Sequence, residues 1–297
     1  MSKSKLNLFD FTMIMVSLVI GMGIFRTPAN VAATSPSPFM FFLIWITGGI
    51  IAICGALTYA EIGSRFPVTG GYYRIFSYAY HPSIAFAVNC IILISNAASL
   101  AGVALIGAEY IIKVVMPNAA NAQQVQIIIA ISSIIIFYAV NLAGLKMSAR
   151  TQNVLTLIKI GLVLLLILPI FFYTGAHEIS VVSNTIASPV LREYIKAFGL
   201  GLVAVSFTYG GYQQSINFGE EVNNPSKNIP RGIIAGLLII IVLYLSVNYA
   251  YYKVIGFNTL KKSNTESILP AALPNRCPAI IAAILVDVFS VLKPITL

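Results

Sequence analysis

Long runs of apolar residues, each close to the length of a membrane-spanning helix, follow one another along most of this 297-residue chain. A helix of about 20 apolar residues crosses the hydrocarbon core of a lipid bilayer. Charged residues make up only 9% of the chain, whereas a soluble domain carries roughly 25%. The sequence therefore predicts an all-α polytopic membrane protein, and it argues against a soluble enzyme.

Seven of these runs are long enough to be membrane spans, and an eighth is weaker. Polar connectors rich in Pro, Ser and Asn separate them, as at 34–38 and 223–230. The first run could instead be a signal peptide, because Lys3 and Lys5 precede it, but its length and the many later spans favour a span. The predicted ranges are 8–33, 39–64, 84–113, 124–144, 152–174, 194–218, 231–256 and, more weakly, 278–292.

Lysine and arginine residues in the connectors predict how the chain is oriented. With the N-terminus inside, the inner connectors hold eight of these residues and the outer connectors hold five up to residue 257. Cytoplasmic loops carry the excess of positive charge, so we expect a cytoplasmic N-terminus in the plasma (inner) membrane, with the lipid bilayer as the surroundings. The positive charges are spread along the chain rather than clustered, so no nucleic-acid partner is expected.

Two of the predicted spans contain glycine-rich interruptions. The first span is broken at Gly21–Gly23, and the sixth is broken at Tyr209–Gly211 and continues into a polar run. Glycine inside a helix costs about 1 kcal/mol relative to alanine, and exposed backbone within a bilayer needs protein or a water-filled cavity around it. The breaks therefore predict a central cavity. Close helix packing is the alternative reading of small residues in membrane helices, and it is expected for Gly48–Gly49, Gly232 and Gly236.

The positions of the two breaks suggest a transporter. They lie five spans apart, so their helices begin on opposite sides of the membrane, as the first helices of two inverted five-helix repeats would. A break exposes amide groups that attract a carboxylate, and it exposes carbonyl groups that accept from an ammonium. A zwitterionic amino acid matches both sets of groups.

Four sequence motifs resemble one family. These motifs are similar to those of the amino acid–polyamine–organocation superfamily of transporters, and most of all to its amino acid permease and exchanger members. The resemblance extends over roughly residues 8–256. The motifs are Gly21-Met-Gly-Ile-Phe25, Tyr59–Pro67 with Gly70–Tyr73, Phe207–Tyr212, and Glu220–Pro225 with Asn228–Arg231.

The resemblance implies a leucine-transporter-like fold of two inverted five-helix repeats, and secondary active transport of amino acids by alternating access. The first repeat would cover about 8–174 and the second would start near 194, within a transmembrane permease domain at 1–257. The resemblance also implies that the carboxylate of the amino acid meets the backbone of the first break, and that its amino group meets carbonyls of both broken helices. The substrate-binding residues implied in this way are Gly21, Met22, Gly23, Ile24, Phe25, Phe207, Thr208, Tyr209, Gly210 and Gly211.

Lys159 lies inside the fifth predicted span. Its long side chain could reach the inner interface and remain solvated there, or the cation could have a role within the membrane. Family members with a lysine at this place use its ammonium in the position of a sodium ion. The resemblance thus implies that Lys159 is the coupling residue of a proton-coupled symporter or an exchanger.

Five charged residues near the inner ends of the spans are candidates for an inner gate, although each could equally be a solvated loop charge. They are Glu61, Arg65, Glu220, Glu221 and Arg231. No cofactor or metal is expected, because the three cysteines and two histidines lack metal-ligand spacing. The chain is not expected to be an enzyme.

The tail at 258–297 shows no family pattern recognisable from the sequence, and prolines interrupt the start of its doubtful eighth helix. The second repeat is therefore predicted to be incomplete, as in a C-terminally shortened permease. The alternative function is a truncated, non-transporting membrane fragment or an interaction subunit.

Overall fold

The computed structural model describes residues 6–21, 23–68, 71–116, 121–143, 145–172 and 191–262. Within these ranges every regular element is a helix, which confirms the all-α prediction. The elements are α1 (Leu8–Val19), α2 (Gly23–Thr34), α3 (Pro38–Arg65), α4 (Gly71–Ala79), α5 (Pro82–Val115), α6 (Ala122–Leu142), α7 (Leu145–Ile167), α8 (Pro169–Phe172), α9 (Leu191–Thr208), the 3-10 helix η1 (Tyr212–Phe218), α10 (Pro225–Ile255) and α11 (Phe257–Lys262).

Four of the described helices, α3, α5, α6 and α10, are long and apolar enough to cross a membrane. The consecutive helices α1 and α2 reach that length together, with a bend of 47° between them. The helices at two further predicted spans, α7 and α9, have apolar stretches shorter than a membrane span. In α7 the apolar stretch is Val154–Ile167, and α9 begins with three charged residues within its first six. The doubtful eighth helix at 278–292 lies outside the described residues.

Local capping interactions explain where several helices begin. At α1 the Asn7 side chain accepts from the Asp10 amide at 2.8 Å, which satisfies one of the unpaired groups of the first turn. At α3 the Ser37 side chain caps the helix and Pro38 takes its first position. Asn224, with φ of 45°, turns the chain immediately before α10, and Pro225 fixes the first residue of that helix. As a result α10 begins six residues before the predicted start of its span.

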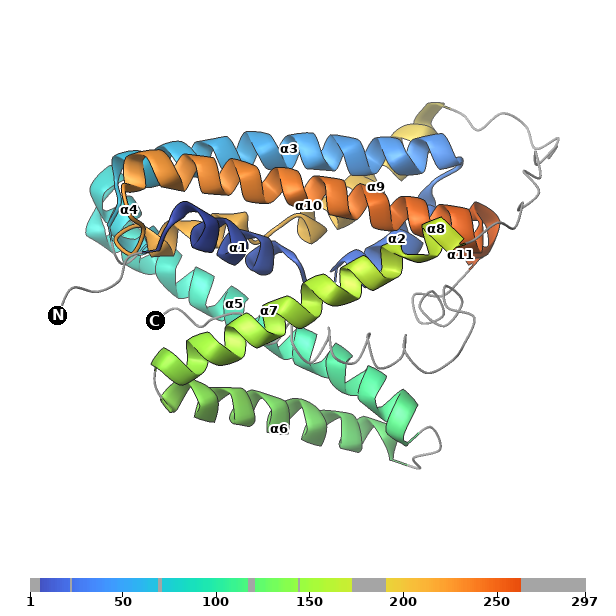
Figure 1. Cartoon of the computed structure of the whole chain (residues 1–297), viewed down its shortest axis with the longest axis horizontal. Coiled ribbons are helices and arrows are strands. Elements are labelled where there is room, and N and C mark those ends of the chain that lie inside the picture. The colour runs from blue at the N-terminus through green and yellow to red at the C-terminus, as the bar shows by residue number, and fades with distance from the viewer. Residues whose placement is uncertain are drawn as a thin grey trace.

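One hydrophobic core joins α1, α2, α3, α9 and α10. In Figure 1 the long helices α3 and α10 lie side by side in opposite directions, with α1 and α2 beside them. The predicted close packing at glycine is present along both long helices. A Cβ atom on Gly236 would lie 2.8 Å from the Cβ of Met15, and one on Gly49 would lie 3.2 Å from Ile241.

The helices α5 and α6 pack against each other outside this core. Most of their large apolar side chains are exposed, among them Phe86, Ile94 and Ile128. Exposed apolar helices of this length suit contact with lipid rather than water. The core therefore contains both broken spans, while α5 and α6 form a peripheral pair.

Candidate functional site

The first broken span changes direction between Val19, the last residue of α1, and Gly23, the first residue of α2. Ile20 has an extended backbone, and its amide still donates to the Val16 carbonyl at 2.9 Å. The next residue, Gly21, is half-buried, and Met22 lies outside the described residues. Beyond the break, Ile24 and Phe25 are buried. The helix is thus interrupted where the glycines predict, within the hydrophobic core.

The second broken span is interrupted between α9, which ends at Thr208, and η1, which begins at Tyr212. Gly211 has φ of 119°, a left-handed conformation that favours glycine. Its amide donates to the Gln213 side chain at 2.8 Å. A side chain from the polar run after the break therefore satisfies one of the backbone groups that the break releases.

The two breaks lie directly against each other. A Cβ atom on Gly211 would collide with the Leu18 carbonyl at the end of α1, and one on Gly23 would lie 2.8 Å from the Thr208 methyl carbon. The buried hydroxyls of Thr208 and Thr27 are 2.7 Å apart. The close approach of these two backbones depends on glycine, and a hydrogen bond between threonines links α2 to α9.

Gly21 could carry a Cβ atom without a collision. Apart from its two neighbours in the chain, the nearest atom of the described residues to such a Cβ would be the Val19 carbonyl oxygen at 3.9 Å, an ordinary van der Waals distance. Gly210, in the other break, is more crowded, because the nearest atom to a Cβ there would be the Phe207 carbonyl oxygen at 3.0 Å. Among the described residues, the main chain at Gly21 therefore has room beside it for at least a methyl group.

The side chain of Phe207 points away from the breaks, with 72% of its surface exposed. Its neighbours Val205 and Tyr209 are fully buried, because residues two apart on a helix face nearly opposite directions. The carbonyl of Phe207 accepts from the Gly210 amide at 3.1 Å. Only the backbone of Phe207 takes part in the break, while Thr208 and Tyr209 place their side chains inside the core.

Three buried aromatic residues surround the breaks, and sequence reasoning missed two of them. Trp45 of α3 and Tyr244 of α10 join Tyr209, with ring centroids 5.3 to 6.1 Å apart. The Tyr244 hydroxyl donates to the Val19 carbonyl at 3.1 Å. The available signal was a tyrosine in the middle of a long apolar span, where its hydroxyl needs a partner.

The family of the chain follows from a comparison with known proteins. Residues 6–292 match the family model described as amino acid permease. The chain belongs to the amino acid permease family. The resemblance inferred from its motifs is thereby confirmed, and the match extends into the tail, where the sequence alone showed no family pattern. Together with its apolar helices, membership in this family makes the permease an integral membrane protein rather than an enzyme.

Several curated transporters are similar to this permease. It is 26% identical to the b(0,+)-type amino acid transporter 1 of Mus musculus over 267 residues, which cover 90% of this chain and 54% of that protein. It is 26% identical to a serine/threonine exchanger of Bacillus subtilis, with 87% and 57% covered. It is 30% identical to a methylthioribose transporter of Bacillus subtilis, with 83% and 55% covered. The permease thus spans about half the length of the curated relatives it matches.

Lys159 of the permease is buried, with 3% of its surface exposed. This burial disfavours the alternative in which the side chain reaches a solvated interface. On the same helix, the Thr156 hydroxyl lies 2.9 Å from that of Ser17 in α1. Residues three apart share one face of a helix, so Lys159 lies on the face of α7 that turns toward the first broken span.

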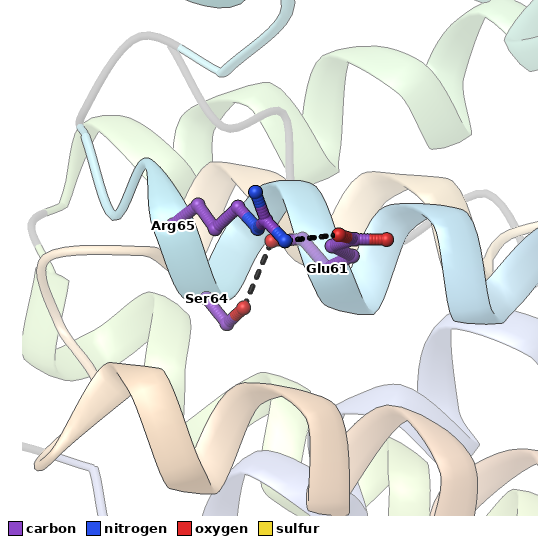
Figure 2. Close-up of polar contacts among 3 residues, drawn as sticks. All are labelled: Glu61, Ser64 and Arg65. Atoms are coloured by element: carbon purple, nitrogen blue, oxygen red, sulfur yellow. Dashed lines mark hydrogen bonds and ion pairs between the residues drawn. The ribbon is translucent and has the colours of Figure 1, made fainter.

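The candidate gate residues are exposed, and two of them pair within one helix. Arg65 reaches back to Glu61, four residues earlier in α3, at 2.7 Å, as Figure 2 shows. The Ser64 hydroxyl donates to the Glu61 carbonyl at 2.8 Å. An exposed pair of this kind contributes less than about 1 kcal/mol to stability. Glu220, Glu221 and Arg231 are also exposed.

Main-chain hydrogen bonds join the segment before α1 to the loop before α10. The Leu6 amide donates to the Glu221 carbonyl at 2.7 Å, and the Asn223 amide donates to the Leu6 carbonyl at 2.8 Å. Glu221 therefore contributes its backbone to this contact. The connection lies at the end of the molecule where α1 and α10 begin (Figure 1).

Proposed function

We propose that this permease transports amino acids across the membrane, and that the main chain of its two helix breaks binds the substrate. The observation that carries the proposal is the direct contact between the two breaks, where two interrupted helices meet in the core. Membership in the amino acid permease family and the names of the relatives support an amino acid as the substrate.

The chemistry of helix ends supports separate places for the two charged groups of an amino acid. The first amides of α2, from Gly23 onward, have no partner within their helix, and the positive end of the helix dipole attracts a carboxylate. The last carbonyls of α1 and the backbone between Phe207 and Gly210 accept hydrogen bonds from the ammonium. The buried residues Ile24, Phe25 and Tyr209 then surround the substrate side chain.

The transport step that we propose is alternating access. A helix broken in the middle of the membrane can tilt its two halves independently, which opens the site to one side at a time. The half of the first broken span that α1 forms would move together with the loop before α10 at the inner side, because hydrogen bonds to Leu6 connect them. Glu61, Arg65, Glu220, Glu221 and Arg231 remain candidates for the gate at that side.

Lys159 is the proposed coupling residue. A buried ammonium needs compensation from nearby polar groups, and Lys159 lies on the face of α7 that is linked to α1. Movement of α1 would change those surroundings. This arrangement supports proton-coupled symport or exchange, and a relative is named a serine/threonine exchanger. We place the permease in the plasma (inner) membrane with its N-terminus in the cytoplasm.

Measuring binding and uptake separately tests this function. A thermal-shift screen of the purified chain against the twenty standard amino acids should identify the substrates that stabilise it. Proteoliposomes that contain the chain should then take up those radiolabelled amino acids faster than protein-free liposomes. Binding without uptake would support the alternative function, a membrane component that does not transport. A chain that binds none of the twenty would contradict the proposal.

A further inference from the structure

The hydroxyl of Tyr244 forms a hydrogen bond with a backbone carbonyl of the proposed site. It donates to the Val19 carbonyl at 3.1 Å, and Val19 is the last residue of α1. The last carbonyls of a helix have no partner within the helix. A side chain from α10 therefore satisfies one of the carbonyls that the break exposes.

The aromatic ring of Tyr244 is held in place independently of this hydrogen bond. Its centroid lies 5.3 Å from that of Tyr209 and 6.1 Å from that of Trp45, and all three side chains are fully buried. These distances are typical of favourable aromatic pairs. Removal of the hydroxyl should leave the ring where it is, so the role of the hydroxyl can be tested separately from the packing.

We propose that the Tyr244 hydroxyl binds the Val19 carbonyl of the first break when no substrate is present, and that the ammonium of the substrate displaces it. This inference rests on the proposed function. The Val19 carbonyl has two lone pairs, and the Tyr244 hydroxyl holds one of them, so an ammonium that binds from the same direction must displace the hydroxyl. A charged donor forms the stronger hydrogen bond, so the amino acid prevails. Tyr244 thereby stabilises the site before substrate binds, and it weakens substrate binding.

Substitution Tyr244→Phe tests the competition directly. The variant should bind the tightest-binding of the twenty amino acids about 2- to 10-fold more strongly, which corresponds to the net value of one hydrogen bond. Without substrate it should unfold at a lower temperature than the wild-type chain. The matched control is Tyr249→Phe, which removes the same hydroxyl from an exposed position of the same helix and should change neither quantity.

A second ligand distinguishes competition from a general loosening of the site. The carboxylic acid that carries hydrogen in place of the amino group has no ammonium to compete for the Val19 carbonyl. Its affinity should rise less in Tyr244→Phe than the affinity of the amino acid does. An equal gain for the acid and the amino acid, or weaker or unchanged binding of the amino acid by the variant, would overturn the inference. Failure of the wild-type chain to bind any amino acid would instead overturn the proposed function and this inference with it.

Discussion

Gly211 occupies a backbone position in the second break that no other residue type fills easily. A residue with a side chain would be strained at its φ of 119°, and a Cβ atom there would collide with the Leu18 carbonyl. The sequence could predict the break, because the preference of glycine for such turns is local. It could not predict that Leu18 would be the neighbour, since that contact depends on the packing of two distant spans.

Replacement of Gly211 by alanine should therefore destabilise the protein. The left-handed backbone alone costs a residue with a side chain about 1–3 kcal/mol, and the collision with Leu18 adds to that. The midpoint of thermal unfolding in detergent should fall clearly below that of the wild-type chain. Gly199→Ala is the matched control, because a Cβ there meets no atom of the described residues within 4 Å. Equal midpoints for both variants would contradict the described contact between the breaks.

Lys159 was identified from the sequence as a cation within an apolar run, but only the structure shows that it is buried. We predict that Lys159→Met reduces amino acid uptake by proteoliposomes to the background rate, because the proposed coupling needs a cation beside α1. Lys196→Met, at an exposed position near the start of α9, should leave uptake near the wild-type rate. Uptake by Lys159→Met at the wild-type rate would rule out the coupling role.

Trp45 and Tyr244 show the limit of sequence reasoning at the residue scale. They lie on different spans, and each taken alone is an ordinary aromatic residue in an apolar run. Their importance comes from their shared contact with Tyr209, which depends on how α3, α9 and α10 pack. Contacts of this kind leave no periodic pattern in the sequence.

At the scale of helices, the first seven apolar runs each overlap helices of the described residues, but they did not predict where each helix ends. Helix α7 begins seven residues before the predicted span. Its first turns contain polar residues such as Lys146, which form helices although they are not apolar. The short helix α4 was not predicted. It contains three tyrosines and one arginine, and every residue except Gly71 is at least partly exposed.

The hydrogen bond between Thr27 and Thr208 should contribute to the packing of α2 on α9. We predict a coupling free energy of about 0.5–1.5 kcal/mol in a double-mutant cycle of Thr27→Val and Thr208→Val, measured by unfolding in detergent. The control cycle pairs Thr27→Val with Thr58→Val, because the exposed Thr58 hydroxyl donates to Cys54 within its own helix. Additive effects in both cycles would show that the bond does not hold the two helices together.

At the scale of the whole molecule, the distribution of positive charge predicts which end faces the cytoplasm. Two exposed residues allow a direct test, Pro36 between α2 and α3 and Ser83 at the start of α5. In a chain without its native cysteines, an impermeant maleimide should label Pro36→Cys in intact cells, and it should label Ser83→Cys only after permeabilisation. The reverse pattern would contradict the proposed orientation.

The arrangement of the whole molecule could be predicted only in part. The resemblance to the permease superfamily implied that the broken spans are neighbours, and the structure places them in one core with α3 and α10. The two inverted repeats remain a prediction, as does the tail beyond Lys262, which lies outside the described residues. Only the contacts between α1, α9 and α10 identify which backbone atoms of the two breaks lie together.

The central claim, that main chain at the first break binds an amino acid, is tested most directly by equilibrium binding to Gly21→Ala. Gly21 does not have a positive φ, and a Cβ there would lie 3.9 Å from the Val19 carbonyl oxygen, so alanine should fold normally and add a methyl group beside the main chain that we propose binds the substrate. We predict that radiolabelled amino acid binds to the wild-type chain and to Gly199→Ala with equal affinity, and that Gly21→Ala binds at least about tenfold more weakly while unfolding at the wild-type temperature. Undiminished binding by a folded Gly21→Ala variant would contradict the account.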